Sequence, residues 1–497
     1  MPDRGRNGTE ISYIFDAFIY FVEINEVGII YKIIAQSILE VAIVQKILTF
    51  LILILVSAGS LSQEPEKVTA SIFEEALTDT TAYNHLRYLC KNTKGRLSGS
   101  PASLEAIKYT RQALKDAGAD TVWLQKVIVP HWVRGFEECR IFSSGLGEYY
   151  LSVSTLGLSA GTDSKGIKAE VIEVHDFDEL KDLGRTRIEG RIVFFNRPAD
   201  NALINTFAGY GGAVNQRLSG AAEASRFGAL AVIVRSATQS LDDFPHTGTT
   251  HYPEDVNKIP AVAVSTAGAE LLSGWLKKDP SLAVRLVTTC KTLPDTTSFN
   301  VIGEIRGYLK PEEYITVGAH LDSWDITEGA HDDAGGCIQA IEMIRIYRLL
   351  GIKPKRSIRA VMFMNEEIST TGGKTYADEA AKKGEKHYAA LESDRGVMSP
   401  RGFGFDASGA RLDNLKSLAK YFVSFNVRDF DAGGGGSDIA PLKSLGTLQI
   451  GYIPDAQRYF WYHHSANDTF EQVNIRELQI GSAAIASLIY LIDLYDY

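Results

Sequence analysis

Histidine and carboxylate residues follow short apolar runs in the last third of the chain, and this pattern constrains its fold most strongly. They are His320 in GAHLDSWD, Asp332 in AHDDAGG, Glu366 and Glu367 in FMNEE, Asp394 in LESD and His464 in WYHHSAND. Most of them come directly after a run that predicts a β-strand. In an open α/β sheet, ligands gather at the carboxyl ends of strands. The sequence therefore predicts that these side chains converge at one edge of a sheet.

The pattern of the last 200 residues is that of an α/β fold. Strands are expected over the segments 299–305, 314–319, 358–364 and 448–453. The continuous apolar run at 358–364 is typical of a strand covered on both faces. Helices are expected over 334–350 and from Asn474 onward, where Glu477 completes a capping-box pattern. We therefore expect a mixed, mostly parallel sheet flanked by helices.

The middle of the chain has a different texture. Four short β-branched runs, at 169–174, 191–195, 230–234 and 261–264, are separated by Gly, Asp and Pro. No cluster of metal-type residues occurs there in the sequence. We interpret residues 165–290 as a small β-rich domain inserted into a catalytic domain made of residues 64–164 and 291–497. In the earlier part, helices are expected over 71–90 and 104–117, and strands near 120–129 and 138–144.

Residues 1–63 form a leader with a signal-peptide pattern. The segment 46–62, KILTFLILILVSAGSLS, joins a positive residue, an apolar core and a small-residue exit. It is short for a transmembrane helix. Because no methionine lies between Met1 and Met343, we interpret residues 1–45 as a gene-model extension or mis-joined exon, with a membrane anchor as the alternative. The expected product is secreted or lysosomal, begins after about Ser60 and has no stable membrane insertion.

Charge and cysteine content narrow the class of protein. The net charge of -10 and the lack of a basic stripe argue against a nucleic-acid binder. None of the four cysteines forms a CxxC pair, which argues against a thiolate zinc site. Cys337 is expected to be a buried free thiol in a core helix. If the protein is secreted, one disulfide among Cys90, Cys139 and Cys290 is an open alternative.

The residue types at the sheet edge are those of a metal-dependent hydrolase. Two zinc ions about 3.5–4 Å apart need a bridging carboxylate and terminal nitrogen or oxygen ligands. A glutamate that is not a ligand must then move protons. In a Glu-Glu pair at an extended strand end the side chains point apart, so one can bind metal while the other acts as base. Asp322, two residues after His320, is placed to accept a hydrogen bond from its second ring nitrogen.

The motifs HLDSWD, HDDAGG, NEE, ESD, GGGGSD and FWYHHSANDT resemble those of the co-catalytic dizinc exopeptidases. The similarity extends from about Ser71 to the C-terminus and includes RLSGSP near its start, while the middle segment resembles a protease-associated domain. The resemblance implies the dizinc exopeptidase fold, two Zn²⁺ per chain and hydrolysis of dipeptides or short peptides through an activated water. It also suggests a homodimer.

The resemblance also assigns roles by motif. His320 and Asp394 would bind one zinc, Glu367 and His464 the other, Asp332 would bridge them, and Glu366 would be the general base and acid. The Asp332–Asp333 peptide is expected to be cis. The four glycines at 433–436 depart from the family pattern, because relatives often have a bulkier residue there; the shape of the specificity pocket is therefore left open.

Three alternatives are kept beside this interpretation. The first is an aminopeptidase of broader specificity. The second is a relative that cyclises N-terminal glutamine, but such enzymes use one zinc and this chain has five candidate ligands. The third is a non-catalytic receptor or scaffold on the same fold, although such proteins lose ligands or the base.

Overall fold

The computed structural model describes residues 26–34, 36–39, 41, 43–46 and 64–497. The chain divides into two units, Met1–Glu64 and Pro65–Tyr497. In the first unit, the described residues 26–46 are helical and exposed. Apart from Lys46, the predicted signal segment lies outside the described residues.

Among the described residues, two helices are long and apolar enough to cross a membrane, Glu26–Lys46 and Ile475–Tyr495. The second is a core helix of the second unit, because 78% of its apolar window is buried. The first lies near the N-terminus and has the length and composition that a signal sequence also has.

The first sheet of the second unit has eight strands in the order β1-β10-β12-β11-β13-β16-β14-β15. The bounds are β1 (Thr121–Val133), β10 (Lys291–Ile305), β12 (Arg356–Phe363), β11 (Lys310–His320), β13 (Lys386–Glu392), β16 (Leu448–Pro454), β14 (Pro400–Phe405) and β15 (Asp429–Ala432). The central strands β12, β11, β13 and β16 are parallel, whereas β1, β10 and β14 join by antiparallel pairs. This arrangement confirms the predicted mixed sheet.

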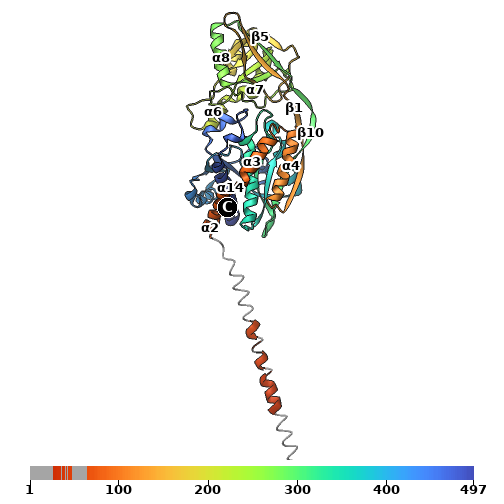
Figure 1. Ribbon diagram of the computed structural model, residues 1–497, viewed down its shortest axis with the longest axis vertical. Coiled ribbons are helices and arrows are strands. Elements are labelled where there is room, and N and C mark those ends of the chain that lie inside the picture. Colours follow the sequence, from red (N-terminus) through yellow and green to blue (C-terminus); the bar gives the residue numbers. More distant parts are fainter. Residues whose placement is uncertain (1–25, 35, 40, 42, 47–63) are drawn as a thin grey trace, which may run out of the picture. The chain divides into compact units, whose positions relative to one another are not determined.

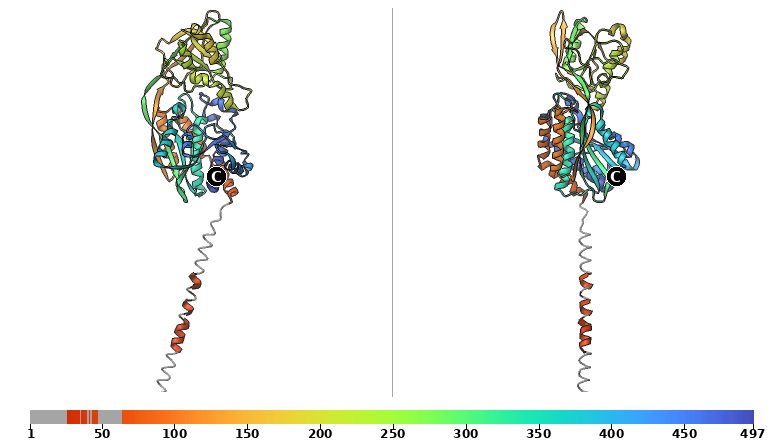
Figure 2. Two further views of the ribbon diagram at one scale, coloured as in Figure 1. Left: turned by 180° about the vertical axis from the view of Figure 1, so that it is seen from behind. Right: turned by 90° about the vertical axis from the view of Figure 1, so that its right-hand side faces the viewer.

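Helices cover both faces of this sheet (Figure 2). One face packs into a single apolar core with α2 (Pro65–Thr78), α3 (Thr81–Asn92), α4 (Pro101–Asp116), α9 (Gly335–Leu349) and α14 (Ile475–Tyr495). The other face packs on α11 (Thr371–Lys383) and η4 (Ala440–Leu445). Every residue of β12 is buried, as its continuous apolar run predicts. The single helix expected over 71–90 is two helices, which are separated at Asp79 and Thr80, where the Asp79 carboxylate accepts the Thr81 N–H at 2.6 Å.

The second sheet also has eight strands, in the order β3-β2-β9-β5-β6-β7-β8-β4. They are β2 (Glu137–Ser143), β3 (Gly147–Leu151), β4 (Val153–Thr155), β5 (Ile167–Val174), β6 (Ile192–Phe195), β7 (Ala231–Arg235), β8 (Ala261–Val264) and β9 (Ala283–Thr288). Its helices are α5 (Phe177–Ile188), α6 (Thr206–Ala213), α7 (Asn215–Arg226) and α8 (Thr266–Lys278). The predicted runs at 169–174, 191–195, 230–234 and 261–264 correspond to β5–β8.

The second sheet differs from the sequence expectation in two respects. It begins at Glu137 rather than near Lys165, because β2 pairs with β9 along Glu137–Phe142. This part of the chain also contains more helix than expected, since each of the two apolar faces of the sheet packs with helices into a separate core. The chain leaves the first sheet at the end of β1 and returns through β10, and these strands pair from Thr121↔Glu304 to Val133↔Lys291 (Figure 1).

All four cysteines are buried and free in the structure. No disulfide therefore links Cys90, Cys139 or Cys290, which the sequence left open. Cys337 lies in α9, as expected, and its thiol contacts the main-chain oxygen of His320 at 3.2 Å.

Candidate metal centre

The predicted site residues follow the four central parallel strands. His320 ends β11, and the Glu366–Glu367 pair follows β12 in the short helix α10 (Glu366–Ser369). Asp394 comes just after β13, and His464 follows β16 through α13 (Tyr459–Tyr462). Because the carboxyl ends of parallel strands share one edge, the fold brings these distant residues together.

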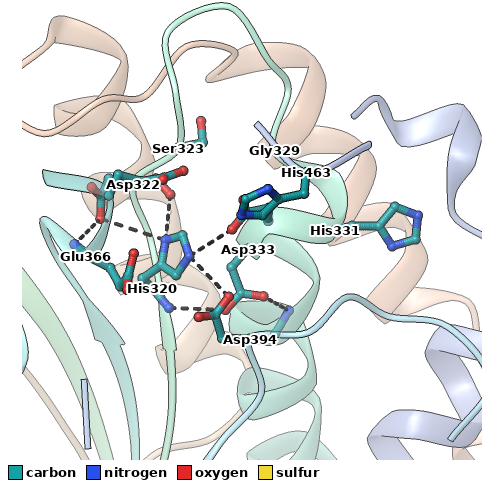
Figure 3. Close-up of polar contacts among 12 residues, drawn as sticks. His320, Asp322, Ser323, Gly329, His331, Asp333, Glu366, Asp394 and His463 are labelled. Carbon is teal, nitrogen blue, oxygen red and sulfur yellow. Dashed lines mark hydrogen bonds and ion pairs between the residues drawn. The ribbon is translucent and has the colours of Figure 1, made fainter. Parts of the chain in front are cut away.

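Three of these side chains form a first candidate metal group. The Nε2 atom of His320 lies 3.1 Å from Asp332 Oδ1 and 3.4 Å from Asp394 Oδ1. His320 is fully enclosed, with 1% of its side chain exposed. Figure 3 shows His320 and Asp394 pointing toward one another at the strand ends. One nitrogen and two carboxylate oxygens that converge in this way can hold a divalent cation.

A second group lies on the other side of Asp332. The Nε2 atom of His464 is 3.1 Å from Glu367 Oε2 and 3.4 Å from Asp332 Oδ2. Asp332 therefore faces His320 with one oxygen and His464 with the other. This is the arrangement that a carboxylate bridging two metal ions requires.

The neighbouring histidines fall into two classes. His463 is also close, with Nε2 3.8 Å from Asp332 Oδ2 and its ring stacked on His464 at 3.6 Å. Sequence reasoning did not single it out. His331 is directed away from the group (Figure 3), and its ring stacks on Tyr462 while Nδ1 accepts the Val397 N–H at 3.3 Å.

Two further aspartates fix the loop that carries Asp332. The Asp332–Asp333 peptide is cis, as the family resemblance implied. Asp333 accepts the main-chain N–H groups of His320 at 3.2 Å and Gly336 at 3.1 Å. Asp468 accepts those of His331 at 2.8 Å and Asp332 at 3.1 Å. Sequence reasoning assigned neither residue a supporting role, although both stand inside the quoted motifs HDD and SAND.

Asp322 acts differently from the expectation. Its main-chain oxygen, not its carboxylate, accepts from His320 Nδ1 at 3.0 Å. The carboxylate is 3.9 Å from that nitrogen. It accepts instead the N–H groups of Asn365 at 2.6 Å and Glu366 at 3.2 Å. Asp322 thus holds the turn that presents the glutamate pair, because this turn leaves two main-chain donors that need a buried acceptor.

Glu366 lines the cavity beside both groups. The Glu366–Glu367 pair begins α10 rather than extending a strand. Successive residues of an α-helix are rotated by about 100° around its axis, so the two side chains diverge. The cavity measures about 460 Å³ and is also lined by Asp332, Asp394 and His464. Burial raises the pKa of Glu366 to about 7. The nearby carboxylates of Asp394 and Asp332 also raise this pKa, whereas His320 lowers it. A carboxyl with that pKa can both accept and donate a proton near neutral pH.

Residues from the part of the molecule that contains the second sheet, called here the second sheet's half, close the same site. Thr249 donates its hydroxyl to the main-chain oxygen of Glu367 at 2.7 Å. Thr247 donates its N–H to the main-chain oxygen of His464 at 2.9 Å, and its own oxygen lies 3.2 Å from His464 Nδ1. Phe207, Tyr210 and Arg217 line the cavity. Within the described residues, two clusters have ligand atoms close enough to hold a metal ion, one of Asp332, His463 and His464 and one of His320, Asp332 and Asp394, and neither includes a residue from 165–290.

The donor set fits zinc. Histidine nitrogens and carboxylate oxygens are among its usual ligands. Asp332 Oδ2 and Glu367 Oε1 are buried without a hydrogen-bond donor. A buried carboxylate oxygen without a donor is costly, and a cation at this point would remove that cost.

Comparisons with known proteins identify the family of the chain. Residues 300–489 match the family described as Peptidase family M28. Carboxypeptidase Q of Bos taurus is 33% identical over 411 residues, which span 83% of this chain and 85% of that protein. Carboxypeptidase Q of Homo sapiens is 32% identical with the same coverage.

Solved structures show the same fold. A peptidase M28 precursor from Shewanella amazonensis has a TM-score of 0.83 and 31% identity, covering 86% of this chain and 96% of that one. The zinc aminopeptidase of Bacillus subtilis has a TM-score of 0.59 at 20% identity, covering 82% and 94%, which is a likeness of fold alone. The chain therefore belongs to peptidase family M28 and is a carboxypeptidase Q-like metallo-exopeptidase.

Proposed function

We propose that this protein is a two-zinc exopeptidase that hydrolyses dipeptides or short peptides. The observation that carries the proposal is the position of Asp332, whose two oxygens face His320 and His464 at 3.1 and 3.4 Å. The Glu366 carboxyl lines the same cavity.

Five residues would hold the metal ions in this proposal. His320 and Asp394 would bind one zinc, Glu367 and His464 the other, and Asp332 would bind both. Bound zinc would polarise the scissile carbonyl and lower the pKa of a water molecule. His463, stacked on His464, would fill the space beside the second group without being a required ligand.

Glu366 would move the protons of the reaction. Its carboxylate takes a proton from the attacking water, and the resulting carboxylic acid gives a proton to the leaving amine. A group that performs both transfers is most efficient when its pKa lies near the working pH. The Asp322 carboxylate keeps Glu366 in place through the main-chain N–H at 3.2 Å.

A broader aminopeptidase is the second candidate. It is favoured by aminopeptidase YwaD of Bacillus subtilis, which is 22% identical over 477 residues, or 90% of this chain and 94% of that protein. The two candidates share the metal chemistry and differ in which end of the peptide is recognised. A receptor or scaffold function is disfavoured, because Glu366 and all five proposed ligands stand at the site.

Three further features belong to the proposal. The second sheet with its helices would be the inserted protease-associated-like domain, here forming one wall of the cavity. The protein would be secreted or lysosomal, on the signal-like pattern at 46–62. It would form a homodimer.

Metal analysis of purified protein alongside a dipeptide panel tests the proposal. We expect two zinc ions per chain and hydrolysis of unblocked dipeptides. Acetylating the amine or amidating the carboxylate of the same dipeptides identifies the end that is recognised. Active protein with only trace zinc would overturn the proposed mechanism.

A further inference from the structure

The segment RLSGSP, which leads into α4, packs behind the candidate metal centre, and none of its residues lines the catalytic cavity. Its first residue, Arg96, has no exposed surface. Within the part of the chain that the structure describes, Arg96 makes no ion pair with a carboxylate. A buried guanidinium is costly unless its N–H groups are satisfied. The hydrogen-bond acceptors around Arg96 therefore show what the segment holds in place.

Three main-chain oxygens accept hydrogen bonds from Arg96, and all three belong to segment 321–329. The Nε atom donates to Leu321 at 2.6 Å, Nη1 to Glu328 at 2.5 Å and Nη2 to Gly329 at 2.8 Å. The guanidinium is planar and presents its donors in a fixed geometry. One rigid group thus fixes the two ends of this segment relative to each other.

The ends of segment 321–329 carry the first metal group. His320 directly precedes the segment. Gly329 ends it and closes the turn around Asp332, because the Gly329 oxygen also accepts the Ala334 N–H at 2.9 Å. Residues 321–329 contain no helix or strand, so no regular ladder of hydrogen bonds sets the 3.1 Å separation of His320 Nε2 and Asp332 Oδ1. The guanidinium supplies such a constraint.

The approach of Arg96 to this segment depends on a glycine. Gly329 has a φ of 58°, in the left-handed region that favours glycine. A Cβ at this position would stand 2.7 Å from Arg96 Nη2 and 2.5 Å from the Cβ of Ser323. The absence of a side chain at position 329 therefore makes room for the guanidinium.

Ser98, two residues after Arg96, makes a corresponding contact with the glutamate pair's turn. Its hydroxyl donates to Asn365 Oδ1 at 2.5 Å, and both residues are buried. The Nδ2 atom of Asn365 then donates to Ser369 Oγ at 2.7 Å and Thr371 Oγ1 at 2.8 Å, across the short helix α10. Asn365 has a φ of 73° and directly precedes Glu366. The orientation of its amide therefore determines how α10 begins.

We propose that Arg96 and Ser98 are positioning residues of the metal centre. Arg96 sets the separation of the two sides of the first metal group, and Ser98 sets the direction in which Glu366 enters the cavity. Neither residue lines the cavity, so both act through the residues that they hold. This inference rests on the proposed two-zinc function and predicts two different defects, one in zinc affinity and one in catalysis.

Zinc affinity tests the role of Arg96. Removing a group that orients metal ligands typically weakens metal binding by about 10- to 100-fold. We expect this loss in Arg96→Met, measured by competition between the protein and a chelator for zinc. Arg96→Lys should recover only part of the affinity, because an ammonium keeps the charge but lacks the planar fork.

A buried arginine elsewhere in the same unit provides the matched control for Arg96. Arg356 is 2% exposed and pairs with Glu313 at 2.8 Å and Asp493 at 3.2 Å. It begins β12, whose other end leads to Glu366. Arg356→Met should lower the melting temperature and leave zinc affinity unchanged.

Steady-state kinetics test the role of Ser98, with a dipeptide that the wild-type protein hydrolyses. Ser98→Ala should lower kcat by about 10- to 100-fold, since a small misplacement of a catalytic group can cost this much. KM and zinc affinity should stay unchanged. Ser103→Ala is the control, because its buried hydroxyl bonds only the first turn of α4, at Ser100, and it should keep the wild-type kcat.

The outcomes separate this inference from the proposed function. Wild-type zinc affinity in Arg96→Met, or in Arg96→Lys if the methionine variant does not fold, would overturn the role of Arg96. An equal loss of affinity in Arg356→Met would assign the effect to general destabilisation and overturn it too. An unchanged kcat in Ser98→Ala would overturn the role of Ser98. These results leave the two-zinc function standing, whereas wild-type protein that binds no zinc would refute that function and this inference with it.

Discussion

Thr249 donates its hydroxyl to the main-chain oxygen of Glu367 at 2.7 Å, although the two residues are 118 positions apart. The contact joins the half of the molecule that contains the second sheet to the turn that carries a proposed zinc ligand. Together with Thr247, which bonds the main chain of His464, it ties both outer ligands to one segment. The second sheet's half thus contributes to the geometry of the site without supplying a ligand.

The first prediction concerns this contact. Thr249→Val keeps the shape of the side chain and leaves the buried Glu367 carbonyl without its donor, which typically costs about 1–3 kcal/mol. We expect a lower free energy of unfolding and weaker zinc binding, measured by denaturant titration and by competition with a chelator. Thr249→Ser keeps the hydroxyl and should behave nearly as wild type. Equal zinc affinity in the valine and serine variants would show that the contact does not support the ligand.

The second prediction separates the two adjacent glutamates. Glu366→Gln should retain zinc but lose activity by about 10²–10⁴-fold, the usual contribution of a general acid or base. Glu367→Gln should lose zinc as well as activity, because Glu367 lies 3.1 Å from His464 Nε2. Zinc analysis and dipeptide hydrolysis on the same samples measure both effects. The reverse pattern would exchange the assigned roles, and full activity in Glu366→Gln would exclude the mechanism.

The third prediction concerns removal of metal. A ligand that binds only the folded state stabilises it, by about 2.7 kcal/mol when its concentration is 100 times Kd. Chelated protein should therefore melt at a lower temperature than the zinc-loaded protein and regain its stability when zinc is returned. Asp332→Ala should abolish this difference, since Asp332 faces both groups. A chelated protein that melts as the loaded one does would contradict a buried zinc site.

The fourth prediction uses a carboxylate far from the site, just before β13. Burial alone would raise the pKa of Glu385, but hydrogen bonds from His387 and Arg359 outweigh it and lower the pKa from 4.5 to about 2. The ionised form is therefore stabilised by folding. Its contribution, on the order of 2–3 kcal/mol, is present above about pH 4.5 and is lost as the pH falls toward about 2.

Glu385→Gln tests this contribution. The variant should be less stable than wild type at pH 7, and the difference should shrink as the pH falls from about 4.5 toward 2, because the wild-type carboxylate then takes up a proton. Urea unfolding at a series of pH values measures the difference. A constant difference across that range would assign the loss to packing rather than to the charge.

Much of the fold follows from local patterns in the sequence. The apolar runs at 358–364 and 448–453 mark β12 and β16, and Asn474 caps α14 by accepting the N–H groups of Arg476 and Glu477. These features depend on neighbours in the chain, so periodicity and capping rules reveal them. The start of the second sheet was missed, because pairing of β2 with β9 depends on residues about 150 positions apart.

Local expectations about side-chain partners were less successful. Asp322 was expected to orient His320 through its carboxylate, yet the main-chain oxygen does so, and the carboxylate binds the turn at Asn365. The sequence places Asp322 two residues after His320 but does not show that Asn365 is also close to it. That second contact forms because β11 and β12 are neighbours in the sheet and bring their ends together.

The sequence by itself determined which residue types follow which strands, and hence that His320, Glu367, Asp394 and His464 share the edge of a parallel sheet. The shared edge follows from the direction of the strands together with the motifs. Only the tertiary structure decided that Arg217 and Thr249 reach the same cavity. Arg217 contacts His464, which lies 247 positions further along the chain, and Thr249 contacts Glu367, which lies 118 positions further along. Contacts between residues so far apart depend on how the two sheets pack, and no local pattern encodes that packing.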